Sequence, residues 1–194
     1  MANKITTFRF PDGVCIAQAL PPAPAAVTMD SPALLVMTDL TQVRAATIHP
    51  GATLALAERT MIHQGVRLLF VVTDMPCVDG IVSLLDIQGE EAMQHAHRHH
   101  VRRAELTVSD VMSKLSELDA VDFAGLRNAS VSQAVATLEE CGRPHLLVSE
   151  AATSTSSPRI RGIISRTQIE RQLGRSLPNV PIATTFAKLA KSLA

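Results

Sequence analysis

The sequence predicts an α/β chain of the α+β type, built from two β-α-β-β-α repeats related by a pseudo-twofold axis, each a small sheet with helices on one side. Two observations support this prediction. A helix-and-strand block occurs twice, and a strand that runs into a short polar helix start occurs twice, in the same order. Because one unit of about 55 to 60 residues leaves apolar surface uncovered, we expect the repeats to pack against each other.

The residues before the repeats predict a hairpin and a linker. Residues 4–19 place a Pro-Asp-Gly turn between two short β-prone runs, a pattern typical of a hairpin. Residues 20–26, LPPAPAA, favour an extended linker because proline disrupts helices and central strands. We therefore divide the chain into an N-terminal segment at 1–35, repeats at 36–104 and 105–175, and a tail at 176–194.

The first repeated block aligns residues 53–72 with residues 130–149 without a gap. Thr53 matches Ser130 at a predicted helix start, and Gly65 matches Gly142 at a predicted helix end. A hydrophobic run follows each glycine, which predicts a buried strand.

The second repeated block aligns GIVSLLDI (80–87) with GIISRTQI (162–169). The offset between matched glycines is 77 for Gly65 and Gly142, and 82 for Gly80 and Gly162, so the second copy carries five extra residues. The polar stretch TSTSSP (153–158) predicts a longer hairpin tip at the insertion.

Composition argues against several classes of partner. The chain has 18 basic and 18 acidic residues, so no net charge attracts nucleic acid or an anionic membrane. It has no Trp, no Tyr and five Phe, and so lacks the aromatic platforms on which single-stranded nucleic acids stack. No apolar run approaches the roughly 20 residues needed to span a bilayer.

The chain is expected to be cytoplasmic. Its three cysteines lie far apart without a C-x-x-C pair, which is poor material for disulfides or a thiolate metal site. The N-terminus has no continuous apolar stretch ahead of Arg9 and Asp12, unlike a signal peptide.

Taken together, the two blocks resemble a tandem pair of cystathionine-β-synthase (CBS) domains, the arrangement called a Bateman module, as in stand-alone bacterial CBS-domain proteins. The resemblance covers roughly residues 36–174. Copy one carries it in ATIHPGATLALAERTMIHQGVRLLFVV and DGIVSLLDI, and copy two in VSDVM, SVSQAVATLEECGRPHLLV and RGIISRTQIERQL. Copy two departs most before its first helix, where VDFAGLRNASV replaces TIHPGATL.

The resemblance implies that an adenosine-containing nucleotide (AMP, ADP, ATP or S-adenosylmethionine) binds between the repeats and regulates an attached or partner protein. Gly80, Ser83 and Asp86 match the family element in which the Asp binds ribose hydroxyls and the Ser binds phosphate. A carboxylate accepts hydrogen bonds from a cis-diol, and a helix N-terminus offers N–H groups to phosphate. The family also implies that residues of the first strand pack the base and close the pocket; these are Thr47, Ile48 and Pro50.

Helix capping is the alternative interpretation of the same residues. Ser83 and Asp86 form a capping pattern, and so do Ser165 and Gln168 in copy two. Capping explains both copies, whereas ribose binding by a carboxylate explains only the first, because glutamine accepts a hydrogen bond without charge. One occupied site is therefore favoured over two.

Arginines and histidines add further candidates. Arg67, Arg143 and Arg166 are predicted beside the cleft, where they would neutralise phosphates, and Arg166 ranks first because it lies within the repeated element. On a helix continuing from Asp86, His95 and His99 share a face with Glu91 one turn earlier, the weak pattern of a metal site. The alternative is a solvated helix made pH-sensitive by its imidazoles.

The function expected from the sequence is regulatory. The sequence has no motif typical of a serine hydrolase, a P-loop nucleoside triphosphatase, a dinucleotide-binding enzyme or a zinc protease. We therefore expect that the protein is not an enzyme and requires no cofactor. The first hypothesis is a nucleotide sensor that forms a homodimer and acts on an unidentified protein; the alternatives are a ligand-free dimerisation scaffold and a metal-responsive module. The C-terminal residues Phe186, Leu189, Ala190 and Leu193 form an apolar helical stripe with Lys188 and Lys191 outside it. This pattern is typical of a segment that packs on its own domain or a twin subunit; the alternative is a groove on a partner protein.

Overall fold

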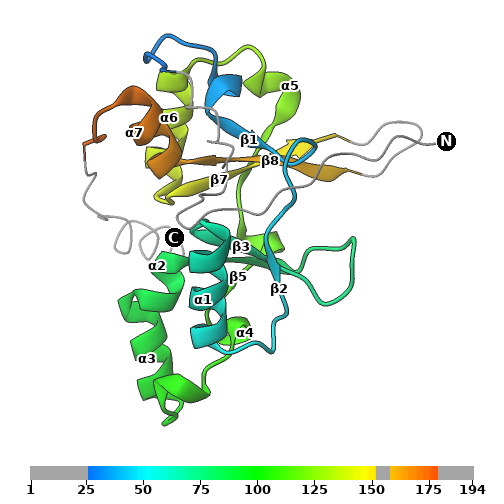
Figure 1. Ribbon diagram of the computed structural model, residues 1–194, viewed down its shortest axis with the longest axis vertical. Coiled ribbons are helices and arrows are strands. Elements are labelled where there is room, and N and C mark those ends of the chain that lie inside the picture. Colours follow the sequence, from blue (N-terminus) through cyan, green and yellow to red (C-terminus); the bar gives the residue numbers. More distant parts are fainter. Residues whose placement is uncertain (1–25, 152–157, 179–194) are drawn as a thin grey trace, which may run out of the picture.

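The computed structural model describes residues 26–151 and 158–178 and contains two four-stranded sheets. The first sheet has the order β2-β3-β4-β5, and the second has the order β1-β8-β7-β6. The sheets face each other in the middle of the molecule, and the helices lie on their outer sides (Figure 1). The strands are β1 (Met37–Asp39), β2 (Thr47–Ile48), β3 (Leu68–Val71), β4 (Gly80–Ser83), β5 (Ser113–Lys114), β6 (Ala120–Asp122), β7 (His145–Glu150) and β8 (Arg159–Ser165).

The predicted order of a strand, a helix, two strands and a second helix is confirmed in both repeats, and each repeat has one further helix that was not predicted. The first repeat uses α1 (Leu54–Gln64), α2 (Leu84–Gln88) and α3 (Glu90–Arg98), and the second uses α5 (Phe123–Leu126), α6 (Val131–Cys141) and α7 (Arg166–Leu173). A short helix α4 (Val108–Val111) lies between them, and single 3-10 turns occur at η1 (Ala33–Val36), η2 (Arg103–Glu105) and η3 (Leu115–Glu117). The predicted N-terminal hairpin and C-terminal helix lie outside the described residues.

The predicted helix boundaries are confirmed by their caps. Thr53 and Ser130 accept hydrogen bonds from the backbone N–H of the third helical residue, and Gly65 and Gly142 adopt the left-handed conformation that ends the helix. One boundary was predicted wrongly. The helix that Asp86 opens does not continue to His95, because Gly89 has an extended backbone (φ −76°, ψ 174°) that separates α2 from α3. Glycine is suited to this position, since an added Cβ would lie 2.5 Å from the Leu85 carbonyl oxygen.

Each sheet receives one of its edge strands from the other half of the chain. β1 lies before β2 in sequence, yet it pairs with β8 of the second sheet. In the same way β5 lies before β6 and pairs with β4 of the first sheet. The two repeats are therefore interleaved, and neither sheet is complete without the other half of the chain.

A charged cluster fastens β1 to the second sheet. The guanidinium of Arg161 lies 2.8 Å from the Asp39 carboxylate and 3.3 Å from that of Glu150, and it stacks 4.7 Å from the centre of the Phe123 ring. Hydrogen bonds from Arg161 and Thr41 hold the pKa of Asp39 well below its usual range. Asp39 therefore stays ionised and paired at the edge of the sheet.

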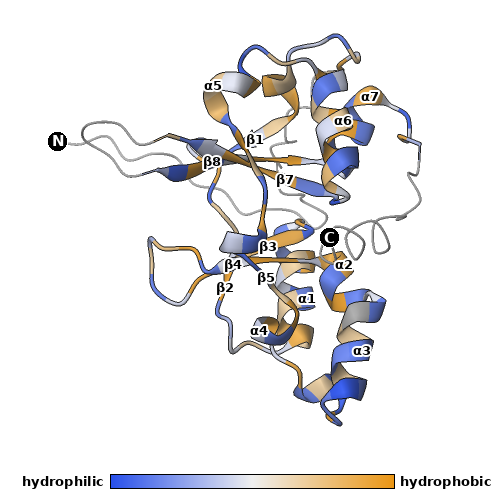
Figure 2. Ribbon diagram, turned by 180° about the vertical axis from the view of Figure 1, so that it is seen from behind, coloured by the Kyte–Doolittle hydropathy of each residue, from blue (hydrophilic) through white to orange (hydrophobic). Residues whose placement is uncertain are grey.

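Strand alternation divides the apolar residues between three clusters. On β3, Leu69 and Val71 pack against the helices of the first half, whereas Leu68 and Phe70 point the other way, into a cluster shared with Leu147 of β7. The strands β3 and β4 are accordingly coloured hydrophobic where the halves meet (Figure 2). Burial on both faces explains why the LLFV run shows no polar alternation.

Glycine is required where the exchanged strands pass β4 and β8. An added Cβ would lie 2.2 Å from the Ser113 carbonyl oxygen at Gly80, and 2.7 Å from Met37 Sδ at Gly162. Both contacts are with the exchanged edge strand of the respective sheet. The repeated glycine thus has a structural role in both copies.

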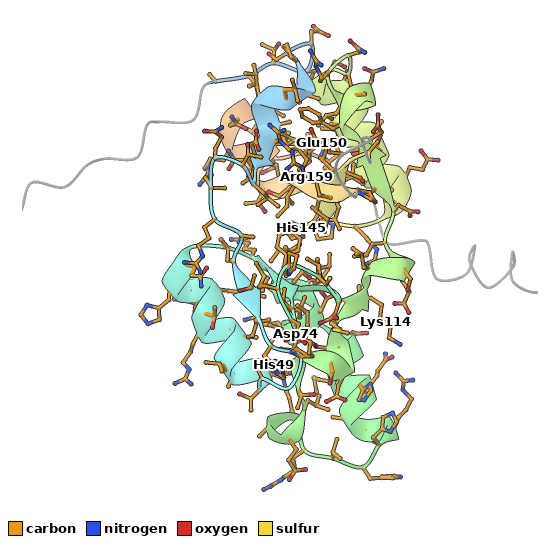
Figure 3. The ribbon with its side chains drawn as sticks, turned by 90° about the vertical axis from the view of Figure 1, so that its right-hand side faces the viewer. His49, Asp74, Lys114, His145, Glu150 and Arg159 are labelled. Atoms are coloured by element: carbon orange, nitrogen blue, oxygen red, sulfur yellow. The ribbon has the colours of Figure 1, made fainter. Side chains whose placement is uncertain are left out.

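His145 lies between the two halves, as Figure 3 shows. It shares a strand face with Leu147, two residues along β7, and so points toward the first sheet. Burial, and secondly the charge of Arg67, lower the pKa of His145 to about 4. The imidazole is therefore neutral in the folded protein at physiological pH.

We predict that Gly80→Ala and Gly162→Ala each destabilise the protein by about 1 to 3 kcal/mol, because the new methyl group displaces an edge strand. Gly125→Ala is the matched control, since no atom lies within 4 Å of its added Cβ and its φ is not in the left-handed region. Urea unfolding measures all three. Equal stability of the three variants would contradict this role for the repeated glycine.

We also predict that His145 makes the fold acid-sensitive. Its folded pKa of about 4 lies below the value of 6.5 expected when unfolded, so the unfolded chain takes up a proton first and stability falls as pH drops from about 6.5 to 4. The loss attributable to this residue is at most about 3 kcal/mol. His145→Leu, which copies Leu68 of the first repeat, should remove this part of the pH dependence of urea unfolding; an unchanged pH profile would refute the assignment.

Candidate functional site

Ser83 and Asp86 form a complete capping box at the start of α2. The Ser83 backbone N–H and hydroxyl each donate to Asp86 Oδ2 at 2.7 Å, and the Asp86 N–H donates to Ser83 Oγ at 3.3 Å. Ser83 is buried and Asp86 is partly exposed. Within the described residues Asp86 Oδ1 has no hydrogen-bond partner, so half of the carboxylate remains available.

The start of α2 has few free N–H groups for a phosphate. The N–H groups of Ser83 and Asp86 are used in the box, and that of Leu84 donates to the Arg67 carbonyl at 3.0 Å. The helix is also only five residues long. An anion at this position would therefore need side-chain cations rather than the helix N-terminus.

Strand register identifies which residues share the face of Ser83. Ser83 pairs with Leu68 on β3, and the parallel pairing of β2 continues back to place Ala45 beside Leu68. Leu68 and Ala45 both pack in the cluster between the sheets. The candidate site is therefore a row of residues across the first sheet. Ser83, with Asp86 bonded to it, lies at one end of the row, and Arg67 immediately precedes Leu68 in the sequence.

The other predicted residues of copy one lie farther away. Thr47 is exposed on the same face, opposite Phe70, two residues along β2. Ile48 points to the helix side and is buried in the core of the first half. Pro50 follows beyond the end of β2, where its carbonyl accepts from Ser109 N–H, and Gly80 lies at the opposite end of β4 from Ser83.

The three predicted arginines have different surroundings. Arg67 is exposed, and no carboxylate in the described part of the chain lies within ion-pair distance of it. Its positive charge contributes to the lowered pKa of His145 in the second half. Arg143 donates to Ser113 Oγ at 2.9 Å, a link between the two halves.

Arg166, the first-ranked phosphate candidate, is engaged elsewhere. Its guanidinium donates to the carbonyl oxygens of Leu177 and Pro178 and, at 3.3 Å, to Glu170. Leu177 itself is buried in the core of the second half, and its N–H donates to Glu170 at 3.0 Å. In this structure Arg166 thus fastens the segment after α7 back onto that helix.

Copy two keeps the serine cap but not the full box. Ser165 Oγ accepts from Gln168 N–H at 3.1 Å, while the Gln168 side-chain oxygen accepts from Arg171 instead of reaching back to Ser165. Ser165 pairs with His145 where Ser83 pairs with Leu68. The second position therefore offers an amide and an imidazole in place of a carboxylate and an aliphatic side chain.

Sequence reasoning missed Ala45 and His145. Ala45 precedes the short strand β2, and only the strand register reveals its place beside Leu68. A signal for His145 was present, because the gapless alignment matches this polar residue with Leu68 in an otherwise apolar run.

The histidine-rich helix does not form a metal site in the described structure. The rings of His95 and His99 stack at 4.3 Å between centroids, and His95 Nε2 lies 3.9 Å from Asp110 Oδ1. Stacked rings do not direct their nitrogens toward one point, as coordination requires. Among the described side chains, which exclude that of Glu91, no group of three His, Cys, Asp or Glu residues is arranged to hold a metal ion.

None of the helices in residues 26–151 and 158–178 is long and apolar enough to cross a membrane.

No protein-family model and no curated protein matches this sequence. Solved structures nevertheless share its fold. An uncharacterized conserved protein from Pyrococcus horikoshii is 17% identical at a TM-score of 0.53, covering 79% of this chain and all of its own. A putative signal-transduction protein with CBS domains from Burkholderia ambifaria MC40-6 is 18% identical at a TM-score of 0.50, covering 70% of this chain and 88% of its own.

The two interleaved sheets, the repeated caps and these structural neighbours agree on the architecture. The chain has the fold of a tandem CBS-domain pair.

Proposed function

We propose that this protein is a regulatory CBS pair that binds one adenosine-containing nucleotide between its two halves, at Ser83, Asp86 and Arg67. The observation that carries the proposal is the half-free carboxylate of Asp86, which is hydrogen-bonded to Ser83. Ser83 is the last residue of β4 and lies on the strand face directed toward the other sheet. The sequence resemblance supplies the ligand class. Regulation, rather than catalysis, is the role that the sequence resemblance implies.

Capping and ribose binding are compatible at Asp86. Oδ2 accepts both donors of Ser83, which fixes the carboxylate in one orientation. Oδ1 then accepts a hydrogen bond from a ribose hydroxyl, strengthened by the negative charge. The cap thus prepares the carboxylate for a ligand, and no rearrangement of α2 is needed.

Phosphate groups would be held by Arg67. Its guanidinium is exposed and lies close enough to His145 of the second half to lower the pKa of that imidazole. A phosphate at Arg67 would therefore lie near the interface between the two halves. Such a ligand favours the packing of the halves in which Arg67 and His145 are close, which is the requirement for a regulatory effect.

We propose a single site per chain. In copy two the amide of Gln168 is bonded to Arg171, and the guanidinium of Arg166 is bonded to the segment after α7. Neither group is available in the manner of Asp86 and Arg67.

The alternative function is a ligand-free interaction scaffold. The capping box at Ser83 is complete without any ligand, which favours this alternative. Under either function we propose a homodimer, since Ile62 on α1 and Leu85 on α2 are apolar and well exposed, with exposed fractions of 74% and 57%. The regulated protein, if any, is a separate partner.

We predict that Asp86→Ala abolishes nucleotide binding, whereas Asp110→Ala does not. Asp110 forms the same box with Thr107, at 2.7 and 2.8 Å, on α4, and so is a matched control for the loss of a cap. Each variant should lose about 1 kcal/mol of stability. A nucleotide at ~100 times its Kd should add about 2.7 kcal/mol to the wild type and to Asp110→Ala only.

Thermal unfolding with AMP, ADP, ATP, S-adenosylmethionine and GTP measures this difference. If no nucleotide shifts the melting temperature of the wild type, the scaffold function replaces the sensor function. If Asp86→Ala still responds like the wild type, the ligand binds elsewhere.

We predict that Arg67→Gln weakens binding of ATP by about 10- to 100-fold, the usual effect of losing a hydrogen bond to a charged group. Adenosine should bind the variant and the wild type equally, because it has no phosphate. Arg59→Gln, on the exposed surface of α1, is the control for removing one positive charge. Calorimetric titration measures both ligands, and an equal loss of ATP and adenosine affinity would assign Arg67 to the nucleoside instead.

A further inference from the structure

The second half contains a groove on the outer side of its sheet, away from the candidate nucleotide site. Its volume is about 260 Å³. Its floor is apolar and comes from β7, β8 and α6, with Leu146, Ile164 and Ala134 all nearly fully buried. The α5 turn, including Gly125 and Leu126, forms the opposite wall.

The groove exists because the second repeat carries an extra turn of helix. Five residues (49–53) join β2 to α1, whereas eight (123–130) join β6 to α6, and this longer connection contains α5. Small residues face the hollow beside α5, namely Gly125, Ala129 and Ala134. An added Cβ at Gly125 would meet no atom within 4 Å. The hollow is therefore left open by the described part of the chain.

One acidic side chain lines the groove, and a second follows the lining residues along α6. Asp122 is exposed and uses Oδ2 to accept from the Gly125 N–H, so its second oxygen remains free. Along α6, Gln133 and Thr137 line the groove, and Glu140 follows on the same helical face, exposed. The occupant that fits is an apolar segment with positive charges beside its apolar residues.

We propose that this groove is the docking site of the chain's own C-terminal segment, residues 179–194. That segment carries an apolar stripe of Phe186, Leu189, Ala190 and Leu193 at helical spacing, with Lys188 and Lys191 beside it. An engineered cavity of about 150 Å³ holds a benzene molecule, so the groove has room for the Phe186 ring and part of a second apolar side chain. The lysines complement Asp122 and Glu140.

The segment starts within reach of the groove. Arg166 fixes Leu177 and Pro178 at the start of α7, and the Arg166 N–H donates to Pro144, three residues after the end of α6. From that end back to Gln133 the helix is about 12 Å long. Residues 179–185 span up to about 23 Å when extended. Arg166 therefore holds the residues just before the segment on the half of the molecule that contains the groove.

Limited trypsin cleavage after Lys188 and Lys191 tests this proposal on the full chain. We expect cleavage in the wild type to be slow. It should become at least about five-fold faster in Phe186→Asp, which removes the main apolar contact, and in Gly125→Leu, which places a larger side chain at a residue that lines the groove. A five-fold change lies at the lower end of the coupling that is typical of two interacting sites. Ser192→Asp, outside the apolar stripe, is the control and should cleave like the wild type.

The double variant decides whether the two changes act on one contact. Phe186→Asp combined with Gly125→Leu should cleave no faster than either single variant, because the shared contact is already lost. Unchanged cleavage in both single variants would overturn the proposal. So would protection that disappears on dilution, because that result places the segment in the groove of a second copy. The test is independent of nucleotide, and so its failure leaves the proposed function standing.

Discussion

The fold depends on the exchange of edge strands between the two repeats. β1 pairs with β8 and β5 with β4, so each sheet takes a strand from the segment that precedes the other repeat. A single repeat would leave that edge unpaired and one face of its sheet exposed to water. The exchange covers the edge, and the face-to-face packing of the sheets covers the apolar surface between them. The two repeats are therefore expected to fold as one unit.

This constraint also determines what can vary at the interface between the halves. Residues 80 and 162 must be glycine because an exchanged strand passes close to each of them. At the interface, the matched positions Leu68 and His145 show that both an aliphatic side chain and a neutral imidazole are accommodated there. Differences between the repeats are therefore most informative at the strand ends and helix starts, where packing does not decide the residue.

The sequence allowed the repeated elements and their order to be predicted, but neither the edge strands β1 and β5 nor their pairing. Helix starts at Thr53 and Ser130 and ends at Gly65 and Gly142 have local causes, since a cap is formed by residues close in the chain. β1 and β5 have three and two residues and pair with strands far away in sequence, so no local pattern marks them. The same reason explains the site. The contact of Ser83 with Asp86 is local and was predictable, whereas Ala45 beside Leu68 requires the strand register.

Both repeats begin a helix with a serine cap after the second strand of the hairpin, but the side chains around that cap have different partners in the two copies. In copy one the carboxylate of Asp86 is positioned by the cap and half free. Arg67, whose carbonyl accepts from the Leu84 N–H at the start of α2, has no ion-pair partner in the described structure. In copy two Gln168 and Arg166 are both bonded, the latter to the chain segment after α7. If the first copy senses a ligand and the second anchors the chain's C-terminal segment, the packing of the two sheets is the physical link between them. A ligand that contacts both Arg67 and the side of this interface that holds His145 changes the stability of that packing. Through the packing it also affects the second half, to which the C-terminal segment is attached.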